Sequence, residues 1–262
     1  MKKLPYFALF AFISLVSCSD DEGSSDGPTS SFLPLTATSA WVYDVNLDGQ
    51  TVGRDSLYVN GETTISGKTY QKLNTKEMPT GFYTNALNNN NVRKEGDKLV
   101  ITGATGLGLD EFFPVSIAVT DFVMFKENSG NNSELDAISG VIEQDLQGFP
   151  LKIDYNLKSV FKESLASFTV PGGESYTNVK VMKLVANLKI TTDYLVPVIN
   201  TSVTIAVLNP QDVIVSTQYY AEGVGMIYSK TDVNFTLNDF SQFNIELPIP
   251  QEGSSTVEEF LD

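Results

Sequence analysis

The chain has 262 residues, with 32 acidic and 17 basic side chains, a formal net charge of −15, one cysteine and no histidine. Nucleic acid and anionic lipid headgroups are normally bound by basic patches, so this charge argues against both as ligands. The absence of histidine excludes nucleophiles that use an imidazole base and zinc sites built on histidine. Only carboxylate, lysine or tyrosine side chains remain for catalysis. The length is sufficient for a hydrophobic core that needs no disulfide.

The first residues have the layout of a secretory signal peptide. Two lysines precede an apolar run over residues 6–16, which ends in Ser17 and Cys18. A membrane-spanning helix needs about 20 apolar residues, so this run is too short to span a bilayer. With Leu15 three positions before the cysteine, the segment resembles the lipobox of bacterial lipoproteins. The resemblance implies removal of residues 1–17 and lipid attachment at Cys18; the alternative is an ordinary signal peptide that ends at a chance cysteine.

The residues that follow Cys18 are polar and acidic. The run Ser19-Asp20-Asp21-Glu22 resembles the export signal that carries lipoproteins of the Bacteroidota to the outer face of the outer membrane. The resemblance implies display on the cell surface; the alternatives are a solvated linker and the periplasmic leaflet. Residues 18–31 contain too few apolar side chains to pack, which predicts a flexible tether. The folded domain is expected to span residues 32–262.

The first half of that domain shows short strand patterns separated by turn signals. Expected strands are rich in aromatic and β-branched residues, and the turns contain Asp48-Gly49, Asn60-Gly61 and Gly96-Asp97. The expected strands cover residues 41–45, 51–59, 64–73, 81–87, 92–101 and 114–125. A polar loop over residues 128–133 marks a possible subdomain boundary.

The second half begins with an ambiguous stretch and then gives a clear β pattern. Apolar residues between 135 and 146 recur at helical spacing, but Gly140 interrupts them, so strands are favoured and one short helix is the alternative. Turns are expected at Pro171-Gly172-Gly173 and Asn209-Pro210, and residues 248–262 are expected to form an acidic tail. The expected strands cover residues 168–170, 179–191, 203–208, 213–220, 226–229 and 233–237. This pattern predicts an all-β fold, an antiparallel meander forming a sandwich or open barrel.

Three separated patches resemble a broad group of β-rich Bacteroidota lipoproteins of uncharacterised function. The patches are Phe32–Leu35 with Trp41-Val42-Tyr43, Thr169–Gly173 with Val179, and Tyr219–Met226 with its Gly223-Val224-Gly225 turn. In that group a tryptophan-containing strand opens the domain and a Gly-Val-Gly turn precedes a late strand. The resemblance implies the same β architecture and supplies no catalytic residues.

One motif has the spacing of a calcium-binding loop. Asp44, Asn46 and Asp48 occupy positions one, three and five, Gly49 follows at six, and Asp55 stands at twelve. The pattern resembles the loops of dockerins and EF-hands, in which such oxygens converge on a cation. However, the flanking residues are strand-like where the motif requires helices. A β-hairpin with an Asp-Gly turn is the favoured interpretation.

Other polar patterns carry weaker signals. Three glycines at positions 103, 106 and 108 predict a mobile loop, because the third glycine of a dinucleotide fingerprint is missing. The acidic pairs Asp110-Glu111 and Glu258-Glu259 are interpreted as solvated surface charge, since neighbours on a strand point to opposite faces. Asp55-Ser56-Leu57 resembles a short Bacteroidota O-glycosylation motif.

The tyrosines offer a second kind of site. Exposed aromatic rings can stack on sugars, and candidates are Tyr83, Tyr219, Tyr220 and Tyr228. Most are expected in the core instead, because tyrosine packs well in sheets.

The function expected from these patterns is that of a lipid-anchored, cell-surface, non-catalytic binding or structural module of the outer membrane. The alternative is a glycan- or calcium-dependent binding component of a nutrient-uptake system, and a carboxylate-based hydrolase is a further alternative. The expected partners are the membrane, through the lipid on Cys18, and a protein or glycan, and not nucleic acid. Neither a cofactor nor a metal is expected.

Overall fold

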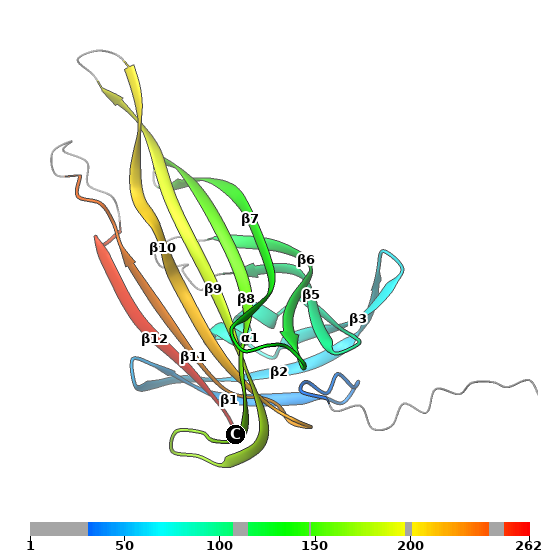
Figure 1. Ribbon diagram of the computed structural model, residues 1–262. Coiled ribbons are helices and arrows are strands. Elements are labelled where there is room, and N and C mark those ends of the chain that lie inside the picture. Colours follow the sequence, from blue (N-terminus) through cyan, green and yellow to red (C-terminus); the bar gives the residue numbers. More distant parts are fainter. Residues whose placement is uncertain (1–30, 107–114, 147, 197–200, 241–248) are drawn as a thin grey trace, which may run out of the picture.

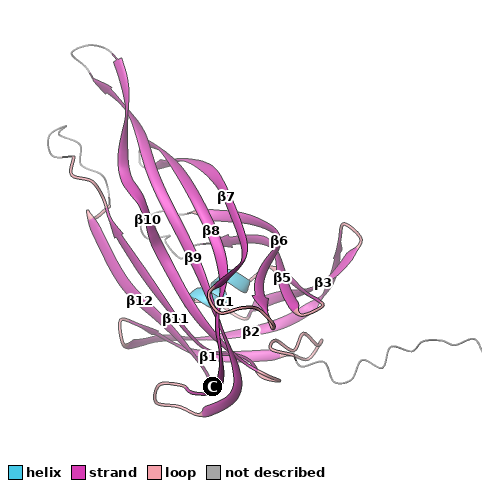
Figure 2. Ribbon diagram, viewed as in Figure 1, coloured by secondary structure: helices cyan, strands magenta, loops and turns pink. Residues whose placement is uncertain are grey.

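A computed structural model describes residues 31–106, 115–146, 148–196, 201–240 and 249–262, which contain many strands and a short helix (Figures 1 and 2). Cys18, Asp110 and Glu111 lie outside the described residues. The elements are β1 (Ala40–Leu47), β2 (Gln50–Ile65), β3 (Lys68–Thr75), α1 (Phe82–Leu87), β4 (Asn91–Glu95), β5 (Lys98–Gly106), β6 (Ser116–Lys126), β7 (Ser133–Leu146), β8 (Phe149–Thr169), β9 (Ser175–Val196), β10 (Thr201–Ala221), β11 (Gly225–Thr236) and β12 (Glu252–Leu261).

The described strands form one antiparallel sheet of twelve strands that curls into a nearly closed, barrel-like shape. The strand order is β6-β5-β4-β3-β2-β1-β12-β11-β10-β9-β8-β7, so β12 lies between β1 and β11. The two edge strands, β6 and β7, meet where the Val123 N–H donates to Asp136 Oδ2 at 2.9 Å, and β6 also contacts β8, where the Ser159 hydroxyl donates to the Val123 carbonyl at 2.5 Å. The all-β antiparallel prediction is confirmed, and the barrel-like form decides between the two expected architectures.

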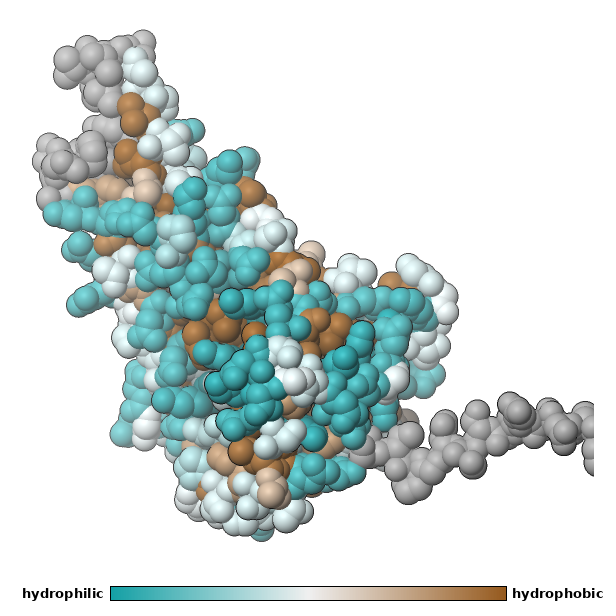
Figure 3. All heavy atoms as spheres, viewed as in Figure 1, coloured by the Kyte–Doolittle hydropathy of each residue, from teal (hydrophilic) through white to brown (hydrophobic). Residues whose placement is uncertain are grey.

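The hydrophobic core fills the inside of this sheet. Inward positions alternate with outward ones along β1 and β2, as the period of a strand requires, so that Tyr43 and Leu57 are completely buried. The helix α1 packs in the core through Phe82 and Tyr83, and the Tyr83 ring meets Tyr43 and Tyr220 edge to face at centroid distances of 5.9 and 6.2 Å. Hydrophilic side chains cover most of the face in Figure 3, with smaller apolar patches between them.

Several expected turns are present and two are not. Asp48 and Gly49 adopt the positive φ values of 49° and 77° that a tight hairpin turn needs, and the turn at residues 171–173 joins β8 to β9. By contrast, Asn60-Gly61 is a bulge within β2, where the register shifts between Val59 and Glu62, and the turn comes later, at Ser66-Gly67. Asn209-Pro210 is likewise an irregularity inside β10, because the pairing with β9 passes from Leu208 to Gln211.

Two further expectations are corrected. Residues 81–87 were expected to form a strand but contain α1, whereas the ambiguous stretch at 135–146 is strand β7. Residues 248–262 were expected to form an acidic tail, but most of them form the central strand β12, which pairs with β1 and β11. The subdomain boundary expected at 128–133 stays a prediction; this loop connects the two edge strands.

No helix in the described part of the chain is long and apolar enough to cross a membrane.

Candidate functional site

The hairpin that joins β8 to β9 folds against the outside of the sheet. There, Tyr219, Tyr228 and Phe260 stand side by side on β10, β11 and β12, with ring centroids 5.5 and 5.2 Å apart. Phe168 of the hairpin stacks on Tyr219 at 4.1 Å with an interplanar angle of 17°. Buried Val170 and other apolar side chains complete this second hydrophobic cluster. These four rings, called the aromatic row below, fix the hairpin to the sheet.

Between the hairpin and strands β1 and β12 lies an open cavity of about 560 Å³, called the outer groove below. Figure 1 places the hairpin beside the C-terminal end of β12. The volume lies within the range of about 300–1,000 Å³ usual for small-ligand sites. Its lining consists of Asp44, Asn46, Thr51, residues 170–174, Tyr176, Phe260, Leu261 and Asp262.

The outer groove combines aromatic and acidic side chains. Tyr176 and Phe260 are both partly exposed, and the carboxylates are those of Asp44, Glu174 and Asp262. No lysine or arginine is among the lining residues, although Arg54 nearby pairs with Asp44 at 3.6 Å and with Asp262. Burial and the neighbouring Glu174 raise the pKa of Tyr176, so its hydroxyl stays a hydrogen-bond donor at neutral pH. The groove therefore suits a neutral ligand that has hydroxyl groups and an apolar face, and disfavours an anion.

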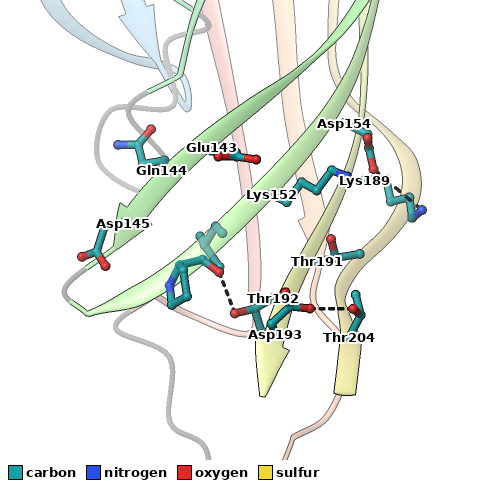
Figure 4. A pocket seen from close by; sticks show the side chains of 12 residues that line it. Glu143, Gln144, Asp145, Lys152, Asp154, Lys189, Thr191, Thr192, Asp193 and Thr204 are labelled. Carbon is teal, nitrogen blue, oxygen red and sulfur yellow. Dashed lines mark hydrogen bonds and ion pairs between the residues drawn. The ribbon is translucent and has the colours of Figure 1, made fainter. Parts of the chain in front are cut away.

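A second hollow, of about 640 Å³, lies over β7, β8, β9 and β10 (Figure 4). Its lining is mostly charged or hydroxylic, and many of these groups satisfy each other. Lys189 Nζ lies 3.7 Å from Asp154 Oδ2, and the Thr204 hydroxyl donates to Asp193 at 2.5 Å. Because this hollow has no aromatic ring in its lining and several of its polar groups are engaged across strands, it is the weaker candidate.

The inside of the sheet holds two buried carboxyl groups, Asp55 on β2 and Glu259 on β12, with 5% and 0% of their surface exposed. Glu259 accepts the N–H groups of Tyr83 and Thr84, at 2.7 and 3.0 Å. Asp55 accepts the Gly81 N–H at 2.7 Å and the N–H of the preceding threonine at 3.0 Å. The two carboxyl groups thus capture N–H groups at the start of α1, which have no partner within the helix.

Burial changes the pKa of Glu259 and also keeps its carboxyl group away from both cavities. Loss of solvation raises its pKa, and the hydrogen bonds from Tyr83 and Thr84 lower that pKa part of the way. Neither Asp55 nor Glu259 lines either of the two cavities described above. The interpretation of Glu258-Glu259 as solvated charge is therefore wrong for Glu259, and Glu258 is partly buried where it accepts the Tyr228 hydroxyl at 2.6 Å.

The four residues with calcium-loop spacing do not converge. Asp44 is paired with an arginine of β2, Asn46 accepts a β2 threonine hydroxyl at 2.8 Å, and Asp48 accepts a β12 backbone N–H at 2.8 Å. Asp55 faces the interior instead, because the strand alternation sends it to the opposite side of the sheet from Asp44. Among the described residues, no group of three or more acidic or thiol side chains is placed to hold a metal ion. The favoured hairpin is what the structure shows.

The expected tyrosine sites divide between the two faces of the sheet. Tyr83 and Tyr220 are in the core, as expected, while Tyr219 and Tyr228 belong to the aromatic row on the outside. Sequence reasoning missed Tyr176, Glu174 and Phe260, which line the outer groove. Their available signal is the aromatic residue three positions after Gly173, but the sequence pattern of the partner strand β12 indicates a tail.

The remaining predicted features are partly outside the described residues. Gly103 is in β5 with a φ of 152°, Gly106 ends β5, and Gly108 lies outside the described residues. Ser56, the expected glycosylation acceptor, is a partly exposed residue of β2. Glycosylation of this residue stays a prediction.

Comparisons of the chain with protein-family models, with curated proteins and with solved structures found no match. The class that the structure defines is an all-β protein with a twelve-stranded, barrel-like antiparallel sheet.

Proposed function

We propose that this chain is a lipid-anchored envelope protein that acts as a non-catalytic binding module, with a neutral glycan as its ligand in the outer groove. The groove supports this proposal because aromatic rings line it together with carboxylate and amide groups. Rings such as Tyr176 offer apolar faces to the C–H surface of a sugar, and the acceptors suit its hydroxyl groups.

The lipid anchor is proposed from the sequence around Cys18. The described chain begins at Ser31, whose carbonyl accepts the Gly223 N–H at 2.7 Å, so the proposed tether enters beside the turn between β10 and β11. Val224 of that turn packs on the same cluster as the aromatic row. The outer groove is therefore near the anchored end, and residues 18–30, fully extended, would span up to about 45 Å. This reach leaves the groove accessible to a glycan.

Glycan binding is tested with the full mature domain on a glycan array, followed by calorimetry on the best neutral oligosaccharide. Replacing Tyr176 by alanine removes a ring of the groove, and we expect at least about a tenfold loss of affinity, equal to roughly 1.4 kcal/mol. Tyr58→Ala is the matched control, because Tyr58 is a partly exposed tyrosine of β2 and is not a lining residue of the groove. An array without any neutral glycan ligand, or equal losses in both variants, would contradict the proposal.

Lipid attachment is tested by metabolic labelling with an alkyne fatty acid in cells that express the full chain. We expect label on the wild type and none on Cys18→Ser. Label on both proteins, or on neither, would exclude Cys18 as the anchor. In intact cells, a membrane-impermeant protease should digest the wild-type protein; protection until lysis would place it inside the envelope instead of on the surface.

A further inference from the structure

The hydroxyl group of Thr84, on α1, stands between the two buried carboxyl groups. Its oxygen lies 2.5 Å from Asp55 Oδ2, 3.0 Å from Glu259 Oε1 and 3.2 Å from the carbonyl oxygen of Gly81. A hydroxyl group has one hydrogen to donate. When that hydrogen points to Asp55, the Thr84 oxygen and Glu259 Oε1 lie 3.0 Å apart with no hydrogen between them. This contact becomes a hydrogen bond only if the Glu259 carboxyl is protonated and donates to the Thr84 oxygen.

The other contacts of the two acids do not place a hydrogen between Thr84 and Glu259. Every further hydrogen-bond partner of Glu259 is a donor: the Tyr83 N–H, the Thr84 N–H and the Ser229 hydroxyl, the last at 3.0 Å. The further partners of Asp55 are donors too, from the backbone and hydroxyl groups of residues 80 and 81. The hydroxyl groups of Ser229 and Thr80 can accept a hydrogen as well as donate one, but each contacts a single acid, whereas the Thr84 oxygen contacts both.

Within the part of the chain that the structure describes, no positive charge is paired with either acid. The ion pairs of the described residues involve neither Asp55 nor Glu259. Glu259 acts electrostatically on the phenols of Tyr43 on β1, Tyr83 on α1 and Tyr220 on β10, which are neutral near pH 7 because burial raises their pKa values further. Two carboxylates so close together in a dry site repel each other strongly.

We infer that Glu259 holds a proton that it donates to the Thr84 hydroxyl, which in turn donates to Asp55, and that this proton keeps α1 docked inside the sheet. With the proton present, Glu259 donates to Thr84 and Thr84 donates to Asp55, so each oxygen contact contains one hydrogen. When Glu259 loses this proton to a base in the solvent, two negative carboxylates face the same Thr84 hydroxyl. Because the two charges repel each other, α1 moves away from β2 and β12. The raised pKa of Glu259 agrees with this arrangement. The fold thus contains a pH-sensitive contact that is independent of the outer groove.

The first test uses the wild-type protein and so does not depend on a variant that folds. Carbon-13 NMR follows the Glu259 carboxyl carbon from pH 4 to pH 9, and hydrogen exchange gives protection factors for the Tyr83 and Thr84 amides, corrected for the intrinsic pH dependence of exchange. We expect Glu259 to titrate above the usual glutamate value of about 4.3, because burial raises its pKa. We also expect the protection of both amides to fall at least tenfold across the same midpoint. Titration of Glu259 at or below the usual glutamate value, or protection of the two amides that is constant across the whole pH range, overturns the inference.

The second test compares Glu259→Gln with Glu252→Gln. Both substitutions remove one carboxyl from β12, but Glu252 is exposed. We expect the pH-dependent loss of α1 protection to disappear in Glu259→Gln and to persist in Glu252→Gln. Persistence in both variants, with the wild-type midpoint, assigns the transition to another group and overturns the inference.

Discussion

Replacing Gly81 by alanine tests the contact between α1 and β12. A Cβ atom at this position would lie 2.1 Å from Oε1, 2.4 Å from Cδ and 2.7 Å from Cγ of Glu259. These distances are far below van der Waals contact, so the buried carboxyl would have to rotate away from the start of the helix. The N–H groups of Tyr83 and Thr84 would then lose their partner.

The size of the effect follows from those two lost hydrogen bonds. Each buried donor left without a partner costs about 1–3 kcal/mol. Because Gly81 has an ordinary φ of −77°, alanine fits the backbone and returns about 0.5–1 kcal/mol by restricting the unfolded chain. We therefore expect the free energy of unfolding to fall by about 1–5 kcal/mol, a large part of the roughly 5–15 kcal/mol usual for a domain.

The assay is urea unfolding, monitored by circular dichroism and by the fluorescence of Trp41, the one tryptophan of the chain. Gly173→Ala is the control, because a Cβ there would meet its nearest neighbour, Val170, at an ordinary 3.5 Å. We expect this control to lie within about 0.5 kcal/mol of the wild type or to be slightly more stable. A Gly81→Ala protein as stable as the control would refute the role assigned to the Glu259 contact.

Three other predictions concern stability. Tyr83→Phe should unfold at about the wild-type urea concentration, since the buried Tyr83 hydroxyl makes no hydrogen bond of ordinary geometry among the described residues and has only a weak contact with the Tyr220 hydroxyl. Tyr220→Phe, which loses a 2.8 Å bond to a glutamine, should lose about 1 kcal/mol, and the reverse order would contradict this. Asp121→Asn should lose about 1–2 kcal/mol at pH 7, because hydrogen bonds from Lys68 and a tyrosine lower the pKa of Asp121 to about 2. That difference should shrink as the pH falls from about 5 towards 2, and a difference independent of pH would exclude the charge as its cause. Truncation after Gln251 removes β12 and should abolish cooperative thermal unfolding; a retained transition would show that the strand is dispensable.

Short sequence signals such as turn dipeptides predicted the parts of the fold whose conformation depends only on neighbouring residues. Asp48-Gly49 defines its hairpin because both residues tolerate positive φ, whatever lies around them. Asn209-Pro210 is an equally strong local turn signal, yet β10 continues through it, because pairing on both sides of the bulge outweighs the lost proline hydrogen bond. The calcium-loop spacing is likewise a local signal that the sheet overrides. The alternation of side chains along β1 and β2 places Asp44 and Asp55 on opposite faces of the sheet, so they cannot bind one cation.

The rest depended on partners far away in the sequence. The segment Phe82-Tyr83-Thr84 has strand-forming side chains, and it is helical where Glu259 and Asp55 accept its first N–H groups. The acidic composition of residues 248–262 hides β12, because its charged side chains point mainly outwards while Glu259 is satisfied inside. Without β12 the outer groove has only one wall, so the site was not predictable from local patterns.

The central place of β12 also sets when the protein can fold. Its neighbours in the sheet are β1 and β11, and the register joins Tyr43 to Leu261, near opposite ends of the described chain. Such a contact closes a very long loop, and contacts between distant residues slow folding. A ribosome or an export channel that releases the chain from its N-terminus delivers β1 first and β12 last. Until then β1 and β11 each have one unpaired edge, so the sheet is completed only when its last strand has been released.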